Sequence, residues 1–104
     1  MDPLRRGAGL YNAGRYWEAH EVWEQRWRET AGAERHLLQG LIQMAAAALQ
    51  STAGKWEGAA RLVARADRHL RAAGRDLGVD GPALADALEA WLAARGPAPR
   101  LALT

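Results

Sequence analysis

Apolar residues recur three and four positions apart along most of the chain, which is the spacing of one face of an α-helix. The pattern is clearest in the C-terminal half, at Ala59, Leu62, Val63, Ala66, Leu70, Ala73 and Leu77, and again at Leu84, Leu88, Trp91 and Leu92. Glycine, proline and capping residues interrupt it. We therefore predict five helices, at residues 3–12, 15–30, 33–52 and 55–75, with a fifth that is opened by residues 80–82 and ends at residue 96.

The third predicted helix differs from the others. From residue 37 to residue 49 it carries no charge and is apolar nearly all round. A helix of this kind belongs in the middle of a bundle. Its polar side chains there are Gln39 and Gln43, and they form one stripe with His36 and Gln50 at spacings of three, four and seven.

A short motif occurs twice in the chain. Residues 14–19 and residues 54–59 each contain a glycine, a cation, an aromatic residue, two further residues and an alanine, and each predicts a turn between two helices. Solenoid arrays of helical hairpins need about three repeats, so two hairpins plus a C-terminal helix are better interpreted as a compact bundle. We predict an all-α fold with one domain over residues 1–96 and a short tail over residues 97–104, frayed or draped over the surface.

The composition supports helices and excludes several chemistries. Of the 104 residues, Ala and Leu supply 38, against only seven β-branched residues, which disfavours a sheet. The chain has no cysteine, and this excludes disulfides, thiolate zinc sites and a cysteine nucleophile. It also lacks a glycine-rich phosphate loop, so we expect no nucleotide cofactor.

Charge and hydropathy limit which compartment and which partners we expect. The net charge is +2, too small by itself to indicate nucleic-acid binding. No signal peptide is visible, and the longest apolar run, residues 44–49, is far shorter than the roughly 20 residues that span a bilayer. We expect a cytoplasmic protein without a membrane partner.

The densest group of aromatic and ionisable residues lies in the second predicted helix, within residues 12–27. At about 100° per residue, its aromatic residues and His20 share one broad face, and Glu24 lies at the border of that face. Such a border between buried and polar surface is typical of a pocket wall. We predict a polar pocket between the second and third helices, lined by Tyr16, His20, Glu21, Trp23, Glu24, Trp27, Gln39 and Gln43.

His20 and Glu24 carry the chemical hypothesis. A histidine and a carboxylate one helical turn apart can share a metal ion or work as an acid–base pair, so both are candidate ligands for a divalent metal. Glu21 is a candidate further ligand or supporting partner. The leading hypothesis is a protein that binds a small ligand or metal, with a hydrolase-like reaction as its extension. In the structural alternative, His20, Glu24, Gln39 and Gln43 form a hydrogen-bond network without catalysis.

Two established metal templates do not fit in detail. The zinc-protease helix has a second histidine where this chain has Glu24, and a carboxylate-bridged di-metal bundle uses Glu-x-x-His, whereas Glu18 precedes His20 by two positions. His69 lies at the border of an apolar face, and we interpret it as a structural residue.

Two other surfaces suggest partners. A basic stripe on the fourth helix, Arg61, Arg65, Arg68 and Arg75, suggests contact with phosphates or nucleic acid, but without interleaved aromatic residues a solvated face is the better interpretation. Trp17 and Trp56 are harder to place in the core, and exposure of either would indicate a helical-hairpin interaction surface. A homodimer is a further hypothesis.

Residues 12–24 with Trp27, and the second block of residues 38–43, resemble the family called domain of unknown function 309. The resemblance covers roughly residues 10–70. It implies a small all-helical bundle found mostly in prokaryotes, with no established activity. The family's characteristic polar positions correspond here to His20, Glu21, Glu24, Gln39 and Gln43.

Overall fold

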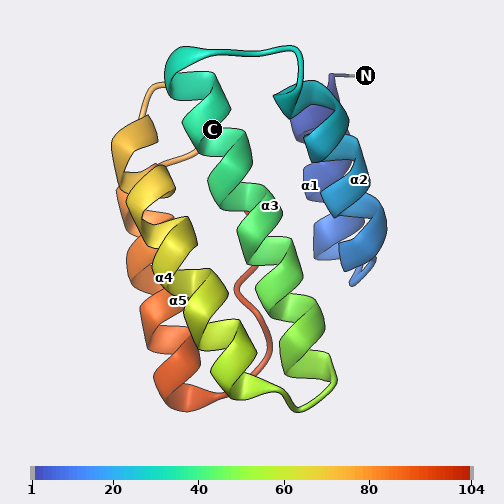
Figure 1. Cartoon of the computed structure of the whole chain (residues 1–104), viewed down its shortest axis with the longest axis vertical. Helices are drawn as coiled ribbons and strands as arrows, with labels where there is room; N and C mark the ends of the chain where they lie inside the picture. Colours follow the sequence, from blue (N-terminus) through green and yellow to red (C-terminus); the bar gives the residue numbers. More distant parts are fainter. Residues whose placement is uncertain (1, 104) are drawn as a thin grey trace.

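The computed structural model describes residues 2–103 and confirms the all-α prediction for them (Figure 1). Within this range the helices are α1 (Pro3–Asn12), α2 (Tyr16–Trp27), α3 (Gly32–Thr52), α4 (Trp56–Ala73) and α5 (Gly81–Ala94). They form two antiparallel hairpins, α1–α2 and α3–α4, followed by α5. Among the described helices, none combines the length and hydropathy needed to cross a membrane.

The central position predicted for the third helix is confirmed. In Figure 1, α3 lies between the α1–α2 pair and the α4–α5 pair, and it packs against both α2 and α4. Its apolar residues, among them Leu37, Leu41 and Met44, are almost completely buried. Close contact with α4 depends on Gly40, because a Cβ atom there would lie 2.7 Å from the Leu70 side chain.

Two helices begin at aspartate caps, and three end earlier than predicted, among them the fifth, which ends at Ala94 and not at residue 96. The side chains of Asp2 and Asp80 accept hydrogen bonds from the first backbone N–H groups of α1 and α5. We predicted that the second helix runs to residue 30 and the fourth to residue 75. In fact α2 ends at Trp27, where the backbone bonds tighten into a turn, and α4 ends at Ala73, where Gly74 takes a positive φ of 74°.

The predicted repeat is present as two turns with the same backbone. Gly14 and Gly54 have φ values of 80° and 73°, and the residues after them cap the next helix with nearly equal torsion angles. In each turn the N–H of the capping cation donates to a carbonyl five residues earlier, at 2.9 Å for Arg15 and 2.8 Å for Lys55. This arrangement closes a helix with a left-handed glycine and satisfies its last carbonyl groups.

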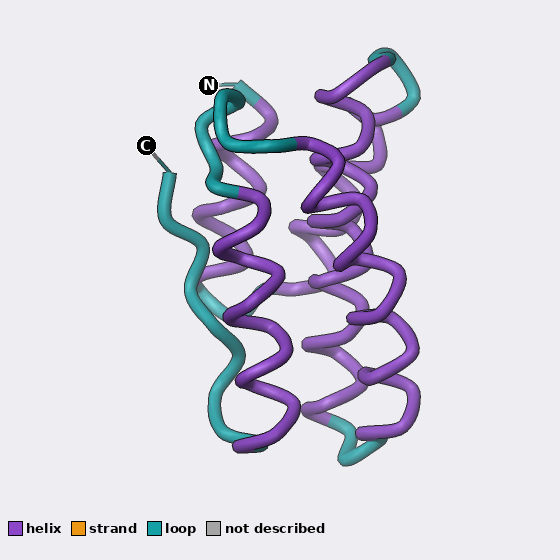
Figure 2. Tube along the Cα trace, turned by 90° about the vertical axis from the view of Figure 1, so that its left-hand side faces the viewer, coloured by secondary structure: helices purple, strands orange, loops and turns teal. Residues whose placement is uncertain are grey.

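The C-terminal segment packs on α1 over the part that the structure describes. Figure 2 shows residues 95–103 running back along the bundle. Asn12 exchanges two hydrogen bonds with the backbone of Leu101, at 2.9 and 2.8 Å, and the Tyr11 hydroxyl donates to the carbonyl of Pro99 at 2.8 Å. Burial and the neighbouring Tyr16 raise the pKa of Tyr11, so this donor stays protonated. The tail is therefore fixed by specific contacts as far as residue 103.

Candidate functional site

Three polar side chains follow one another along α2 at successive turns. His20 Nε2 lies 3.6 Å from Glu24 Oε2, and Arg28 donates to Glu24 Oε1 at 2.7 Å. The spacing of four residues brings each side chain beside the next. Because Arg28 engages one carboxylate oxygen, the other oxygen remains for His20 or for a ligand.

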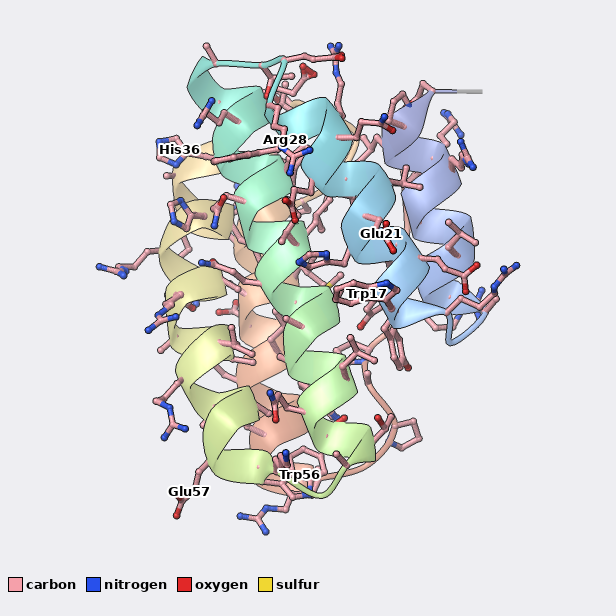
Figure 3. All side chains as sticks on the ribbon, turned by 45° about the vertical axis from the view of Figure 1, so that its right-hand side comes forward. Trp17, Glu21, Arg28, His36, Trp56 and Glu57 are labelled. Carbon is pink, nitrogen blue, oxygen red and sulfur yellow. The ribbon has the colours of Figure 1, made fainter. Side chains whose placement is uncertain are left out.

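The ring of His20 lies beside an exposed tryptophan. Its centroid is 5.2 Å from the Trp17 ring and the two planes differ by 8°, so the rings are stacked. Trp17 is 58% exposed, and Figure 3 shows it at the seam between α2 and α3. The His20 side chain itself is 21% exposed, but its Nδ1 atom is buried and has no hydrogen-bond partner among the described residues.

Gln43 on α3 has the matching feature. Its Oε1 atom is also buried without a hydrogen-bond partner in the described chain. Leaving a buried donor or acceptor unsatisfied costs about 1–3 kcal/mol. Both atoms belong to helices that pack against each other, and neither has its hydrogen-bonding capacity met within the described chain. An amide oxygen accepts a hydrogen bond, and an imidazole nitrogen donates or accepts according to its tautomer.

Three of the predicted pocket residues point elsewhere. Tyr16 packs on Tyr11 at 5.1 Å, and the fully buried Trp23 donates its indole N–H to the carbonyl of Leu4 at 3.3 Å, so both face α1. Glu21 is exposed and lines an outer groove between α1 and α2 (Figure 3). The helical wheel placed these residues with His20, but α2 divides its inner face between α1 and α3.

Two further predicted residues meet in a different hollow. Trp27 and Gln39 line a hollow of about 260 Å³ together with Gly32, Arg35, His36 and His69. The guanidinium of Arg35 lies 4.0 Å above the Trp27 ring. Across this hollow the Nδ1 atoms of His36 and His69 are 3.0 Å apart, a hydrogen bond between α3 and α4.

Sequence reasoning missed the His36–His69 pair. One signal for it was available: His36 precedes the hairpin turn at Gly54 by 18 residues and His69 follows it by 15. Residues at similar distances from a tight turn lie opposite each other in an antiparallel hairpin. The pair therefore needed the hairpin register, which the single-helix patterns did not supply.

The predicted polar pocket and metal site remain predictions. His20, Glu24 and Gln43 line none of the five hollows described, and the Glu24 side chain is 35% exposed. Over residues 2–103, no group of three or more histidine and carboxylate side chains is placed to hold a metal ion. The proposal of His20 and Glu24 as metal ligands thus remains a prediction.

The basic stripe is shorter than predicted. Arg61, Arg65 and Arg68 are exposed on α4, but Arg75 lies beyond the end of that helix and pairs with Asp80 at 3.6 Å. The turn at Gly74 takes Arg75 out of register with the others. Asp67 on the same helix accepts a hydrogen bond from Arg71 at 3.1 Å.

Comparison with known proteins bears on the family. No curated protein and no solved structure shows a significant match to the chain. A family model described as "Domain of unknown function (DUF309)" matches residues 4–62, which include α1, α2, α3 and the first part of α4. The match starts and ends earlier than the resemblance over residues 10–70 that the motifs indicate. It covers more than half of the chain, and the chain therefore belongs to the DUF309 family.

Proposed function

We propose that this protein binds a small polar ligand at the seam between α2 and α3, through His20, Glu24 and Gln43. One observation carries the proposal: His20 Nδ1 and Gln43 Oε1 are buried on two packed helices, and neither has a partner among the described residues. A ligand that supplies these hydrogen bonds offsets two desolvation penalties that the free protein bears.

The chemistry of the seam suggests the class of ligand. Gln43 Oε1 requires a donor, and His20 accepts either a donor or an acceptor at Nδ1. The exposed Trp17 ring, stacked on His20, offers an apolar wall. We infer a neutral compound that carries hydroxyl or amide groups.

A hydrolase-like reaction is the more specific form of this hypothesis. In such a reaction His20 would act as general base on a water molecule, with Glu24, 3.6 Å away, stabilising the imidazolium. The binding proposal does not depend on this step.

The binding proposal is tested by NMR on tag-free protein. Acetamide and glycerol, as minimal amide and hydroxyl probes, are titrated while the Gln43 side-chain amide and the Trp17 indole N–H signals are followed. We expect both signals to move together in the wild type and the Trp17 indole signal to stop responding in Gln43→Met. Gln39→Met is the matched control on the same helix. An unchanged Gln43 signal with both probes, or an equal loss of response in Gln39→Met, contradicts the proposal.

A second candidate function is a protein-interaction surface at the same seam. The exposure of Trp17 favours it, because tryptophan is enriched at the centres of interfaces. Sedimentation of the pure protein tests the homodimer form of this candidate. Self-association that disappears in Trp17→Glu supports it, whereas a monomer at all concentrations excludes it.

A further inference from the structure

The hollow beside α4 contains a pair of histidines that the proposed function does not use. His36 on α3 and His69 on α4 have ring centroids 5.3 Å apart and planes tilted by 31°. Their Nδ1 atoms are 3.0 Å apart and open onto the hollow lined by Trp27, Arg35 and Gln39. Figure 3 shows His36 on the side of α3 next to α4, away from the α2–α3 seam.

The hydrogen bond constrains the tautomers of the two rings. For two neutral rings, one Nδ1 carries a proton and donates it to the lone pair of the other. Neutral imidazole is the form that binds metal ions.

The two nitrogen atoms are close to the separation that a metal ion requires. With metal–nitrogen bonds of about 2.0–2.1 Å and tetrahedral angles, two ligating nitrogens lie about 3.3 Å apart. If a metal ion replaces the shared proton, the two nitrogen atoms must therefore move apart by a few tenths of an ångström, with a small rotation of each ring. The displaced proton moves to Nε2 of the same ring, so both imidazoles stay neutral and no net proton is released.

We propose that His36 and His69 form a binding site for a divalent transition-metal ion of the Cu²⁺ or Zn²⁺ class, with the amide oxygen of Gln39, which also lines the hollow, as a further ligand. Imidazole nitrogen favours these ions over Mg²⁺ and Ca²⁺, which prefer oxygen. No carboxylate is among the residues that line the hollow, whereas Arg35 is, so a site for a hard cation is disfavoured. A bound ion would link α3 to α4, and its ligand His69 lies outside the residues that the family model matches.

The chain offers a matched experiment because it contains only three histidines. Tag-free protein is titrated with CuSO₄ in His36→Gln, His69→Gln and His20→Gln, and binding is measured by calorimetry. We expect one Cu²⁺ per chain in the wild type and in His20→Gln. In the other two variants we expect affinity to fall by roughly tenfold or more, since even residues that only support a ligand have effects of that size.

A second measurement needs no substitution. In wild-type protein with ¹⁵N-labelled histidine, Zn²⁺ is expected to shift the Nδ1 resonances of His36 and His69 and to leave those of His20 in place. The proposal is overturned if Cu²⁺ does not bind one per chain in the micromolar range, or if His69→Gln keeps full affinity. It is also overturned if His20→Gln removes the binding, which would move the metal to the His20–Glu24 pair. None of these outcomes depends on Gln43, so the ligand proposal stands or falls separately.

Discussion

The first helical hairpin, α1–α2, and the second, α3–α4, have turns with the same backbone geometry. They differ in the helix that follows the turn. At an offset of 40 residues, Ala19 and Ala59 are both fully buried, and Trp23 and Val63 both face the interior. The exposed positions diverge: Trp17 occupies the place that Glu57 has in the second hairpin. In Figure 3, Glu57 points away from the bundle, whereas Trp17 lies at the α2–α3 seam.

This difference distinguishes positions that packing determines from positions that it leaves free. Buried positions of the two helices match in apolar character because each must fit a neighbouring helix. An exposed position is free of that demand, and a charged residue such as Glu57 suits it. A 58% exposed tryptophan at the matching position needs another reason, and the unpartnered Nδ1 atom of His20, whose ring stacks on Trp17, provides one.

The largest expected effect comes from the buried position of the comparison. Trp23→Ala should destabilise the protein by about 3–5 kcal/mol, because it removes a fully buried side chain and a hydrogen bond to Leu4. Val63→Ala, the matching change in α4, should cost about 2 kcal/mol, since it removes two methyl groups. Urea denaturation measures both. Equal losses would show that the two hairpins contribute alike to the core.

The second comparison concerns close helix contact. Gly40→Ala should destabilise the protein by about 1–2 kcal/mol, because overpacking against Leu70 outweighs the gain in helix propensity. Gly9→Ala on α1 is the control: a Cβ atom there meets nothing within 4 Å, and stability should rise by about 0.5–1 kcal/mol. Thermal unfolding distinguishes the two signs. Stabilisation by both changes would remove the case for close contact at Gly40.

The sign of the stability change in Gln43→Met tests whether the buried acceptor of Gln43 lacks a partner. We expect stability to rise by about 1–2 kcal/mol, because the change removes a buried acceptor without a partner. That corresponds to an increase in Tm of roughly 4–16 °C for a domain of this size. Had Gln43 belonged to a satisfied structural network, the same change would lower Tm. A lower Tm would therefore decide for the structural alternative.

Trp17→Glu places the residue of the second hairpin in the first. Stability should change by about 1 kcal/mol or less, because more than half of the side chain is already in water. The change should remove the largest single share of the tryptophan fluorescence that iodide quenches, since Trp23 and Trp91 are buried and Trp27 and Trp56 are only partly exposed. Unaltered quenching would mean that Trp17 is covered in solution, as expected of a self-association surface.

The smallest expected effect concerns pH. Because the pKa of His69 is lowered from 6.5, the unfolded chain binds more protons than the folded chain below that pH. The stability that this difference controls is fully present above pH 6.5 and decreases as the pH falls toward the lowered pKa. Urea midpoints at about pH 5.5 and about pH 7.5, with chelator present, should differ less in His69→Gln than in the wild type. An identical pH dependence in both proteins would contradict this assignment.

Much of the fold follows from local patterns. The 3.6-residue periodicity, the aspartate caps and the glycine turns each act over a few residues, so they place the helices and the central α3 correctly. The directions of individual side chains depend on neighbours that no local pattern names. Trp23 faces α1 because Gly7 leaves room there for its indole ring, and a Cβ atom at Gly7 would collide with it.

The candidate site was predictable only in part, for the same reason. His20 could be selected from the dense aromatic and ionisable group within residues 12–27, and Gln43 because polar residues are rare between residues 37 and 49. Each has a buried atom without a partner among the described residues. Gln39 could not be separated from Gln43, since only the α3–α4 register shows that it lines the hollow with His36 and His69. Partner assignment between helices is a property of the assembled bundle.

The contacts of the tail with Tyr11 and Asn12 have a consequence for the order of folding. They join residues 88 and 89 positions apart, whereas each hairpin is built from contacts across a short turn. Closing so long a loop is entropically unfavourable until the helices between its ends are in place. The hairpins should therefore form first, and the docking of Leu101 on α1 should come last. Docking of this segment also occupies Tyr11 and Asn12 at the end of α1, so another helical hairpin could not use these two residues for stacking.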